Sequence, residues 1–311
     1  MKQVYWVIGV LVVAVVGLGS LLALQSHSPS EDIKARADLM QNYRIYPVPI
    51  PKTVVFAGEK VPISDFEVRE RLDRELLINT YWQSNTQIIL KRSKRAFAVI
   101  EPILKANGVP DDFKYLAVIE SGLADVVSGS GAAGYWQFMK NTGASYGLEI
   151  SDNADERYNL EKATTAACKY LKHSKEVLGS WTMAAAAYNR GLQGVLNAKN
   201  AQRQTNYYDL YLNSETSRYV PRMVAMKLIF ENPRHYGFQI KPSDYYGLIE
   251  TYAVKVDSNI SSLPNWAIEH HTTYKILREL NPWLQGYEIK ASSKQSYELK
   301  VPALQTQGAE N

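Results

Sequence analysis

The apolar positions divide the chain into a leading hydrophobic run, a long region of helical spacing and a short alternating region. An uncharged run from Val4 to Leu24 follows Lys2. Its length matches the roughly 20 residues that cross a bilayer as a helix, and exceeds the roughly 7–15 residues of a signal-peptide core. We therefore expect residues 1–28 to be an N-terminal membrane anchor or, alternatively, a cleaved export signal. Either would place the remaining chain outside the cytoplasmic membrane.

A polar stretch with alternating prolines follows the hydrophobic run. Pro47, Pro49 and Pro51 favour extended backbone, so residues 29–63 are predicted to form a linker. Order is expected to begin at Ser64, which forms the pattern S-x-x-E of a capping box with Glu67. Apolar residues then recur every four positions at 68, 72 and 76, which predicts an amphipathic helix.

Helical spacing continues from there to about residue 238. A helix is predicted around residues 87–106, with the basic run KRSKR at 91–95 on a solvated face. Further start and stop signals predict three more helices. These are a helix opened by Asp111 and Asp112 and closed by Gly122, a helix opened by Ser180 and closed by Gly191, and a helix at about 217–230. Four alanines at 184–187 predict a smooth helix surface that a second helix can approach closely.

The pattern changes after Tyr246. Apolar residues at 252, 254 and 256 alternate as in a strand, two short helical stretches follow at about 261–270 and 273–280, and residues 296–301 resemble a returning strand. The fold class predicted from these patterns is mainly α, with a separate small C-terminal βααβ domain.

Composition and charge exclude several classes of protein. The 35 Lys and Arg residues exceed the 31 Asp and Glu residues by four, and 46% of positions are apolar, as in ordinary globular proteins. A weak net charge does not indicate a nucleic-acid partner. The single cysteine, Cys168, excludes an intrachain disulfide, and its alanine neighbours predict a packed core thiol.

Several motifs that would indicate a cofactor or metal are missing or lack their context. None of the five histidines has the spacing of a zinc site, and no G-x-S-x-G motif occurs, so we expect neither a metal nor a cofactor. Residues 129–134, GSGAAG, match G-x-G-x-x-G formally, but the pattern before them is helical. A flexible, close-approach loop beside a ligand groove is therefore expected rather than a dinucleotide site.

The segment FKYLAVIESGL at 113–123 carries the first candidate for catalysis. Glu120 falls in the last turn of the helix that Gly122 is expected to close. The helix dipole and partial burial there would both disfavour an ionised carboxylate and raise the pKa of Glu120, as a general acid requires. From this segment alone, a surface glutamate near a helix end remains the alternative.

Four ordered motifs resemble the catalytic domain of lytic transglycosylases, which have a goose-type-lysozyme-like fold and cleave peptidoglycan strands. They are Glu120-Ser121, Gly134-Tyr135-Trp136-Gln137, Ala187-Tyr188-Asn189 and Glu215-Thr216 with Tyr219-Val220. The tryptophan in the second motif and the small C-terminal domain look most like the membrane-bound type D subgroup. Leu160 stands where the family commonly has a proline. The resemblance implies a lysozyme-like domain over residues 64–245 with a helical N-terminal extension.

The resemblance also implies a reaction. The β-1,4 bond between N-acetylmuramic acid and N-acetylglucosamine would be cleaved with formation of a 1,6-anhydro end, and Glu120 would act first as acid and then as base. Since the segments GSGAAGYWQF and AAAAYNRG, which hold the second and third motifs, contain no carboxylate, one group would serve twice. The expected substrate-binding residues are Ser121, Gln137, Tyr188, Asn189 and Tyr219, the two tyrosines by phenol or ring face. Glu215 and Asp155 are expected to form ion pairs with nearby arginines.

Residues 246–305 resemble a LysM domain, a fold that binds glycans containing N-acetylglucosamine. Leu277, Leu280 and the Asn281-Pro282 pair fit that family's helix end, whereas Val256-Asp257-Ser258 replaces its usual glycine. A structural cap is the alternative to glycan binding.

For the whole chain, the alternatives are a non-catalytic wall-binding scaffold and a lysozyme-type hydrolase. The expected partners are peptidoglycan strands and, through the N-terminal segment, a membrane, and the expected location is the cell envelope, facing the periplasm.

Overall fold

The structure is a computed structural model that describes residues 33–34, 45–290 and 296–303. The chain divides into two compact units, Met1–Pro47 and Val48–Asn311. The hydrophobic run at 4–24, and with it the predicted anchor or export signal, lies outside the described residues. Among the helices that are described, none combines the length and the apolar character needed to span a bilayer.

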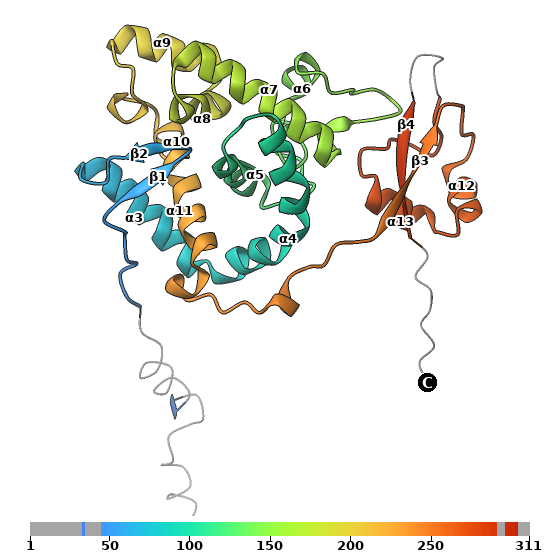
Figure 1. Ribbon diagram of the computed structural model, residues 1–311, viewed down its shortest axis with the longest axis horizontal. Helices are drawn as coiled ribbons and strands as arrows, with labels where there is room; N and C mark the ends of the chain where they lie inside the picture. The colour runs from blue at the N-terminus through green and yellow to red at the C-terminus, as the bar shows by residue number, and fades with distance from the viewer. Residues whose placement is uncertain (1–32, 35–44, 291–295, 304–311) are drawn as a thin grey trace, which may run out of the picture. The chain divides into compact units, whose positions relative to one another are not determined.

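Most of the second unit is helical, as the sequence predicts (Figure 1). Its helices before residue 240 are α3 (Phe66–Tyr81), α4 (Gln83–Ala106), α5 (Lys114–Ser121), α6 (Lys140–Ser145), α7 (Leu160–Leu178), α8 (Trp181–Arg190), α9 (Leu192–Gln202), α10 (Ser214–Ser217) and α11 (Tyr219–Glu231). The short helix α5 packs against α4 on one side and against α11 on the other (Figure 1).

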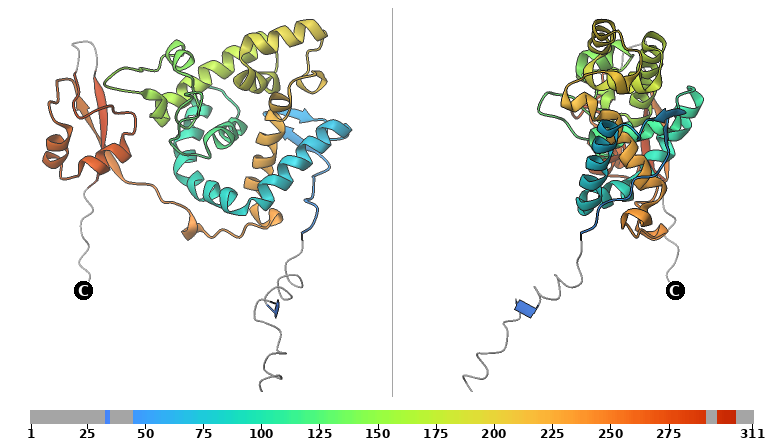
Figure 2. Two further views of the ribbon diagram at one scale, coloured as in Figure 1. Left: turned by 180° about the vertical axis from the view of Figure 1, so that it is seen from behind. Right: turned by 90° about the vertical axis from the view of Figure 1, so that its left-hand side faces the viewer.

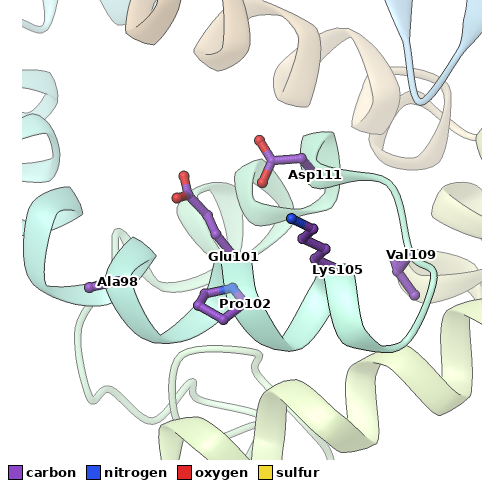
Figure 3. A pocket seen from close by; sticks show the side chains of 6 residues that line it. All are labelled: Ala98, Glu101, Pro102, Lys105, Val109 and Asp111. Atoms are coloured by element: carbon purple, nitrogen blue, oxygen red, sulfur yellow. The ribbon is translucent and has the colours of Figure 1, made fainter.

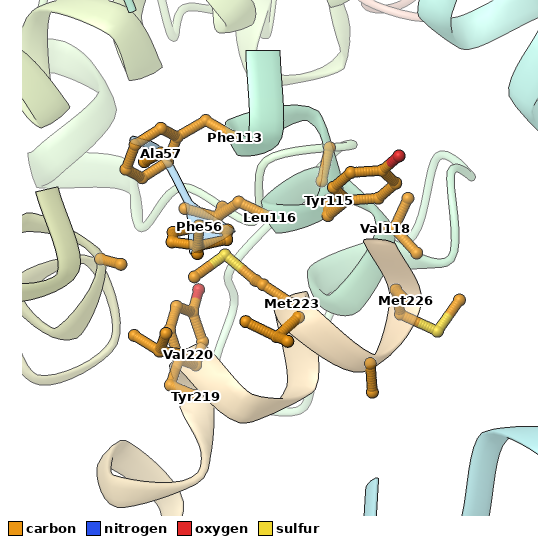
Figure 4. Close-up of a cluster of buried hydrophobic side chains, with 14 of the residues drawn as sticks. Phe56, Ala57, Phe113, Tyr115, Leu116, Val118, Tyr219, Val220, Met223 and Met226 are labelled. Atoms are coloured by element: carbon orange, nitrogen blue, oxygen red, sulfur yellow. The ribbon is translucent and has the colours of Figure 1, made fainter. Parts of the chain in front are cut away.

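Helix α5 is held by burial of its central residues. Tyr115, Leu116, Ala117 and Val118 are buried, and the backbone turns out of the helix at Gly122 in the left-handed region, with φ of 60°. Figure 4 shows side chains from α5, α11 and the segment around Phe56 meeting in one cluster. The predicted closure of this helix at Gly122 is confirmed, whereas Asp111 and Asp112 lie in a 3₁₀ turn, Asp111–Phe113, that precedes it.

The prediction of a linker up to residue 63 is wrong at residues 54–61. Strands β1 (Val54–Phe56) and β2 (Glu59–Val61) form an antiparallel hairpin there. Phe56 is fully buried and its ring meets that of Phe113 edge to face, with centroids 5.7 Å apart. The backbone N–H of Ala57 also donates to Asp112 Oδ2 at 2.6 Å. The alternating prolines just before the hairpin indicate extended backbone, and the sequence pattern does not show the distant residues that stabilise the hairpin.

The predicted capping box at Ser64 is also wrong. Helix α3 begins at Phe66, its N-cap is Asp65, and no side chain caps it. Glu67 pairs instead with Arg71 one turn later. The predicted amphipathic face is nevertheless present, with Val68, Leu72 and Leu76 buried.

The signals at the other helix ends hold. Ser180 accepts from the N–H of Met183 at 3.3 Å, and Gly191 follows the last residue of α8. All four alanines at 184–187 and Cys168 are fully buried, as predicted. The helix predicted at 217–230 is found as α10 and α11, which are separated at Arg218.

The basic run at 91–95 is less free than predicted. Lys94 and Arg95 are exposed, but Arg92 donates to the carbonyl of Gly122 at 3.1 Å and Arg95 donates to the carbonyl of Gly247 at 3.0 Å. The N–H of Tyr246 donates to the carbonyl of Lys91 at 2.9 Å. This face of α4 therefore also holds the chain that leads into the C-terminal domain.

The C-terminal domain has the predicted order of elements. Strands β3 (Thr251–Val256) and β4 (Tyr297–Pro302) pair antiparallel, with Val256 opposite Tyr297, and α12 (Leu263–Glu269) and α13 (Tyr274–Leu280) lie between them in the chain (Figure 2). The amide of Asn281 donates to the carbonyls of Leu277 and Lys300 at 2.9 and 2.7 Å. This buried asparagine ties the end of α13 to β4, which explains the helix end predicted there.

Candidate active site

Glu120 lies in the last turn of α5, as predicted, with its side chain half-buried. The phenol of Tyr219 on α11 donates a hydrogen bond to Oε1. Burial raises the pKa of Glu120 above its ordinary value, although the Tyr219 hydrogen bond and the Arg222 charge oppose the rise and Glu215 adds to it. A carboxyl group of this kind holds its proton to higher pH than an exposed glutamate, which a general acid needs.

Tyr219 contacts the candidate acid but not through its ring. The ring is fully buried in the cluster of Figure 4, where it packs among side chains of α5 and α11. The prediction that its ring face could lie against a sugar is therefore wrong, because only the hydroxyl reaches the site. Burial, reinforced by Glu120, raises the pKa of Tyr219 well above its ordinary value, so it stays a proton donor.

Arg222 is a member of the site that the sequence analysis missed. It lies three residues after Tyr219, on the same face of α11, and its Nη2 donates to the carbonyl of Ile119 at 3.0 Å. It thereby satisfies a free carbonyl at the end of α5 and places a positive charge near Glu120. The spacing of three residues from Tyr219 was the available signal in the sequence.

Asn189 and Glu215 lie side by side, at the end of α8 and in α10. Asn189 Nδ2 donates to Glu215 Oε1 at 2.8 Å, while Asn189 Oδ1 accepts from the hydroxyl of Thr216 at 2.7 Å. The two bonds fix the orientation of the amide. The prediction that Glu215 pairs with an arginine is wrong, because its partner is Asn189, whereas Asp155 does form the predicted ion pair, with Arg157 at 2.6 Å.

Gln137 lies on the loop between α5 and α6, with a positive φ of 49°. Its Nε2 donates to the carbonyls of Val126 and Gly134 at 3.0 and 2.8 Å, which fixes the side chain against its own loop. Because both bonds use the amide nitrogen, the carbonyl Oε1 is the group that Gln137 can offer to a ligand. It makes no direct bond to Glu120.

The remaining predicted residues, Ser121 and Tyr188, both have partners in the protein. Ser121 Oγ donates to the carbonyl of Ala117 at 3.1 Å. Tyr188 donates to the carbonyl of Trp136 at 2.8 Å, and its ring meets Phe138 and Tyr170 edge to face. The hydroxyl of Tyr188 therefore links α8 to the loop that carries Gln137.

The glycine-rich loop at 129–134 packs closely against the backbone of Arg157 at one of its glycines. A Cβ at Gly134 would lie 1.9 Å from the carbonyl oxygen of Arg157, and φ is +75°. Gly131, also at positive φ, has nothing within 4 Å of such a Cβ. The segment GSGAAG was predicted to allow a close approach beside a ligand groove. The close approach that the structure shows is between this loop and the turn before α7.

Figure 3 shows a hollow of about 560 Å³ on α4 and the turn before α5. It is lined by Ala98, Glu101, Pro102, Lys105, Val109 and Asp111, none of them a predicted site residue. Glu101 and Asp111 are both bound to Lys114, at 2.7 and 2.6 Å. The acidic side chains of this hollow are therefore neutralised within the protein, and we assign it no role.

Among the predicted site residues, the carboxyl group of Glu120 has a raised pKa and accepts a hydrogen bond from the phenol of Tyr219, which fits the resemblance to lytic transglycosylases. Comparison with known families agrees: residues 97–211 match the family "Transglycosylase SLT domain", and residues 252–305 match "Soluble lytic transglycosylase C-terminal LysM-like domain". Residues 97–211 are therefore similar to an SLT transglycosylase domain, and residues 252–305 are similar to a LysM-like domain. The resemblance inferred from the motifs is confirmed.

Among individual proteins, the chain is similar to membrane-bound lytic murein transglycosylase D of Escherichia coli strain K12. The two are 30% identical over 190 residues, which cover 59% of this chain and 41% of the relative. The protein of the same name from Escherichia coli O6:H1 matches with the same figures. The chain thus spans about two fifths of the length of the curated relatives it matches.

Proposed function

We propose that the protein is a peptidoglycan lytic transglycosylase. It would cleave the β-1,4 bond between N-acetylmuramic acid and N-acetylglucosamine and leave a 1,6-anhydro end. The observation that carries this proposal is the state of Glu120, a half-buried carboxyl group with a raised pKa and a phenol on one oxygen. The SLT family match over residues 97–211 supports the same class of activity.

Glu120 would protonate the glycosidic oxygen and later, as a carboxylate, deprotonate the C6 hydroxyl of the same muramic acid residue. Tyr219 occupies Oε1, which leaves Oε2 as the atom for proton transfer. The acetamido oxygen of the substrate would stabilise C1 between the two steps. Because the C6 hydroxyl is tethered to C1, effective molarities of about 10⁵–10⁸ M favour ring closure over attack by water.

Five residues are proposed to hold the substrate or to position the catalytic acid, Glu120. Gln137 would accept from a sugar hydroxyl or acetamide N–H through Oε1, and Asn189, fixed by Thr216 and Glu215, would contact the acetamide region. Ser121 follows Glu120 directly and would contact the same region, while Tyr188 supports the Gln137 loop and Tyr219 orients Glu120.

The other parts of the chain would deliver the enzyme to its substrate. We assign residues 64–245 to the catalytic domain, to which the hairpin at 54–61 belongs by its contacts, and residues 246–305 to a domain that binds peptidoglycan. Residues 1–28 would be the anchor or export signal, followed by a linker from residue 29. The name of the relatives, membrane-bound and acting on murein, supports a location in the cell envelope facing the periplasm.

Mass spectrometry of digested peptidoglycan tests the proposal. We expect muropeptides that are lighter by one water than hydrolytic products and that resist reduction by borohydride. Glu120→Gln should lower the rate by at least about 10²–10⁴-fold with the fold intact, because an amide cannot donate the proton. Absence of any cleavage by the native protein would indicate the non-catalytic scaffold instead.

One observation favours a second candidate, a lysozyme-type hydrolase. Glu215 is close enough to raise the pKa of Glu120, so a second carboxylate is present that could activate a water. Its bond to Asn189 argues for a positioning role instead. Reducible N-acetylmuramic acid ends, lost on Glu215→Gln, would establish the hydrolase.

A further inference from the structure

The C-terminal domain is joined by hydrogen bonds to the loop between α6 and α7. The N–H of Asp155 donates to the carbonyl of Trp283, and the N–H of Gln285 donates to the carbonyl of Asn153, both at 2.8 Å. These bonds form an antiparallel bridge between Ala154 and Leu284. Ala154 is fully buried within the hydrophobic core of the C-terminal domain. A loop of the catalytic domain is therefore part of that core.

Side chains add to this junction. Asn153 Nδ2 donates to the carbonyl of Lys290 at 2.9 Å, and the N–H of Lys290 donates to Asn153 Oδ1 at 3.2 Å. The phenol of Tyr297 on β4 donates to Glu149 Oε1 at 2.9 Å. The junction thus has directional bonds at two positions of the loop, Glu149 and Asn153, which a flexible tether would lack.

The same loop continues into Arg157, which holds the segment that carries Gln137. Asp155 Oδ1 accepts from Arg157 Nε at 2.9 Å, and Oδ2 accepts from Nη2 at 2.6 Å, a two-point ion pair of fixed geometry. Arg157 Nη1 donates to the carbonyls of Gly131 and Phe138 at 2.8 and 3.2 Å. One guanidinium group therefore fixes residues on both sides of Gln137.

A cavity is lined by residues of both the catalytic domain and the C-terminal domain. Tyr135, two residues before Gln137, lines a cavity of about 280 Å³ together with Leu280 and Trp283 of the C-terminal domain. The segment at 131–138 is thus bounded by Arg157 on one side and faces side chains of the C-terminal domain on the other.

We propose that Arg157, oriented by Asp155, is a positioning residue that couples docking of the C-terminal domain to the order of the Gln137 segment. This inference rests on the proposed function and adds to it. Asp155 carries the coupling because its backbone binds the C-terminal domain while its carboxylate binds Arg157. The C-terminal domain is then part of the substrate site as well as an attachment to the wall.

The coupling has a distinct kinetic signature. When docking is weakened, the Gln137 segment populates its ordered form less, and apparent substrate affinity falls by that fraction. Saturating substrate restores the ordered form, so KM rises while kcat stays nearly constant. Simple loss of folded protein would instead lower the apparent kcat and leave KM unchanged.

The test uses the full chain and soluble glycan fragments. The double variant Asn153→Ala with Tyr297→Phe removes junction bonds without touching residues 131–138. We expect KM to rise about 2- to 30-fold, the range seen for substitutions along coupled networks, with kcat within about twofold. Arg157→Lys keeps the charge but loses the two-point geometry of the guanidinium group. It should likewise raise KM and leave kcat nearly constant. Lys290→Ala is the matched control, since the ion pair of its side chain is with the exposed neighbour Glu288 and not with the catalytic domain, among the residues that the structure describes.

Two results would overturn the coupling: an unchanged KM in both variants, or a fall in kcat at unchanged KM. If the native protein cleaves nothing, the proposed function fails, and fragment affinity measured by calorimetry then takes the place of KM. Equal affinities of the native protein and the double variant would reject the coupling on that measure too.

Discussion

At the scale of single residues, Glu120 is set by opposing influences of its neighbours. Burial raises its pKa, while the phenol of Tyr219 and the charge of Arg222 lower it. The result is a carboxyl group whose proton is retained to higher pH than in water. Each neighbour can be removed separately, so the pH dependence of activity reports each contribution.

Tyr219→Phe removes the hydrogen bond to Glu120. Since that bond favours the charged carboxylate, its loss should raise the pKa of Glu120 further. Activity that needs the protonated acid is lost as pH rises through this pKa, so the alkaline limb of kcat/KM should move to higher pH. The rate at the optimum should fall about tenfold or more, as for loss of a bond to a charged group. The hydroxyl of Tyr188 binds the carbonyl of Trp136 instead, so Tyr188→Phe should leave the alkaline limb in place. An equal shift of the alkaline limb in the two variants would contradict the assignment.

Glu120→Gln should stabilise the fold at neutral pH. Because the folded pKa of Glu120 lies above the unfolded value, the native state binds more protons, and stability falls as pH rises between the two values. Above this window the native protein carries the cost of a buried carboxylate, which the isosteric amide avoids. We expect a gain of about 0.5–2 kcal/mol at pH 7 that disappears near pH 4. Equal melting temperatures of the two proteins at both pH values would refute it.

At the scale of elements, helix ends are fixed partly by neighbours in sequence and partly by distant residues. Ser180 caps α8 locally, but Glu59 of the β1–β2 hairpin also accepts from the N–H groups of Trp181 and Thr182, at 2.5 and 3.0 Å. A carboxylate there favourably meets the positive end of the helix dipole. The hairpin thereby supports the helix that carries Tyr188 and Asn189 in its last turn.

Glu59→Ala should therefore destabilise the catalytic domain. Loss of a helix cap costs about 1–2 kcal/mol, which corresponds to a fall in Tm of about 2–8 °C for a domain of this size. Lys60→Ala, at an exposed position of the same strand, is the matched control. Thermal unfolding followed by circular dichroism distinguishes them, and equal Tm values would show that the distant cap contributes nothing.

Gly134 and Gly131 form a second matched pair. Gly134→Ala would place a Cβ 1.9 Å from the carbonyl oxygen of Arg157 at a positive φ, whereas Gly131→Ala meets only the backbone strain. We expect costs of about 2–5 kcal/mol for Gly134→Ala, from strain and overpacking, and about 1–2 kcal/mol for Gly131→Ala. Chemical denaturation measures both. A smaller loss for Gly134→Ala than for Gly131→Ala would contradict the close approach.

At the scale of the whole molecule, two domains of one chain meet at the junction formed by Asn153, Ala154 and Tyr297. If both bind the same polymer, linkage raises the local concentration of each at the wall. The junction through Ala154 and Leu284 adds a requirement for geometry that a flexible linker does not impose. Attachment and catalysis are then separable by experiment, because attachment needs insoluble wall and catalysis does not.

Truncation near Tyr246 should weaken co-sedimentation with insoluble wall about tenfold or more while leaving some cleavage of soluble fragments. The reduced cleavage that remains should show the raised KM expected from loss of the junction. Full-length Glu120→Gln, which retains both domains, should sediment as the native protein does. Unchanged sedimentation of the truncated protein would leave the C-terminal domain as a structural cap.

Much of the architecture followed from local signals. Gly122, Ser180 and Gly191 mark helix ends because capping depends on residues a few positions apart, and the alternation at 252–256 marks a strand for the same reason. The position of Glu120 in the last turn of a helix could be predicted because the signal that ends this helix and the surrounding motifs both lie nearby in the sequence. The hairpin at 54–61 was missed because its stability comes from Phe113 and Asp112, more than 50 residues away.

The sequence by itself predicted the candidate residues for the chemistry, the order of helices and strands, and the resemblance to the family. Only the tertiary structure decided how those residues meet. It placed the phenol of Tyr219 on Glu120 while burying its ring, gave Glu215 an amide partner rather than an arginine, and brought Arg222 to the end of α5. It also joined Asp155 to both the C-terminal domain and Arg157. The physical reason is that burial and hydrogen-bond partners depend on packing between elements, which residue spacing along the chain does not encode.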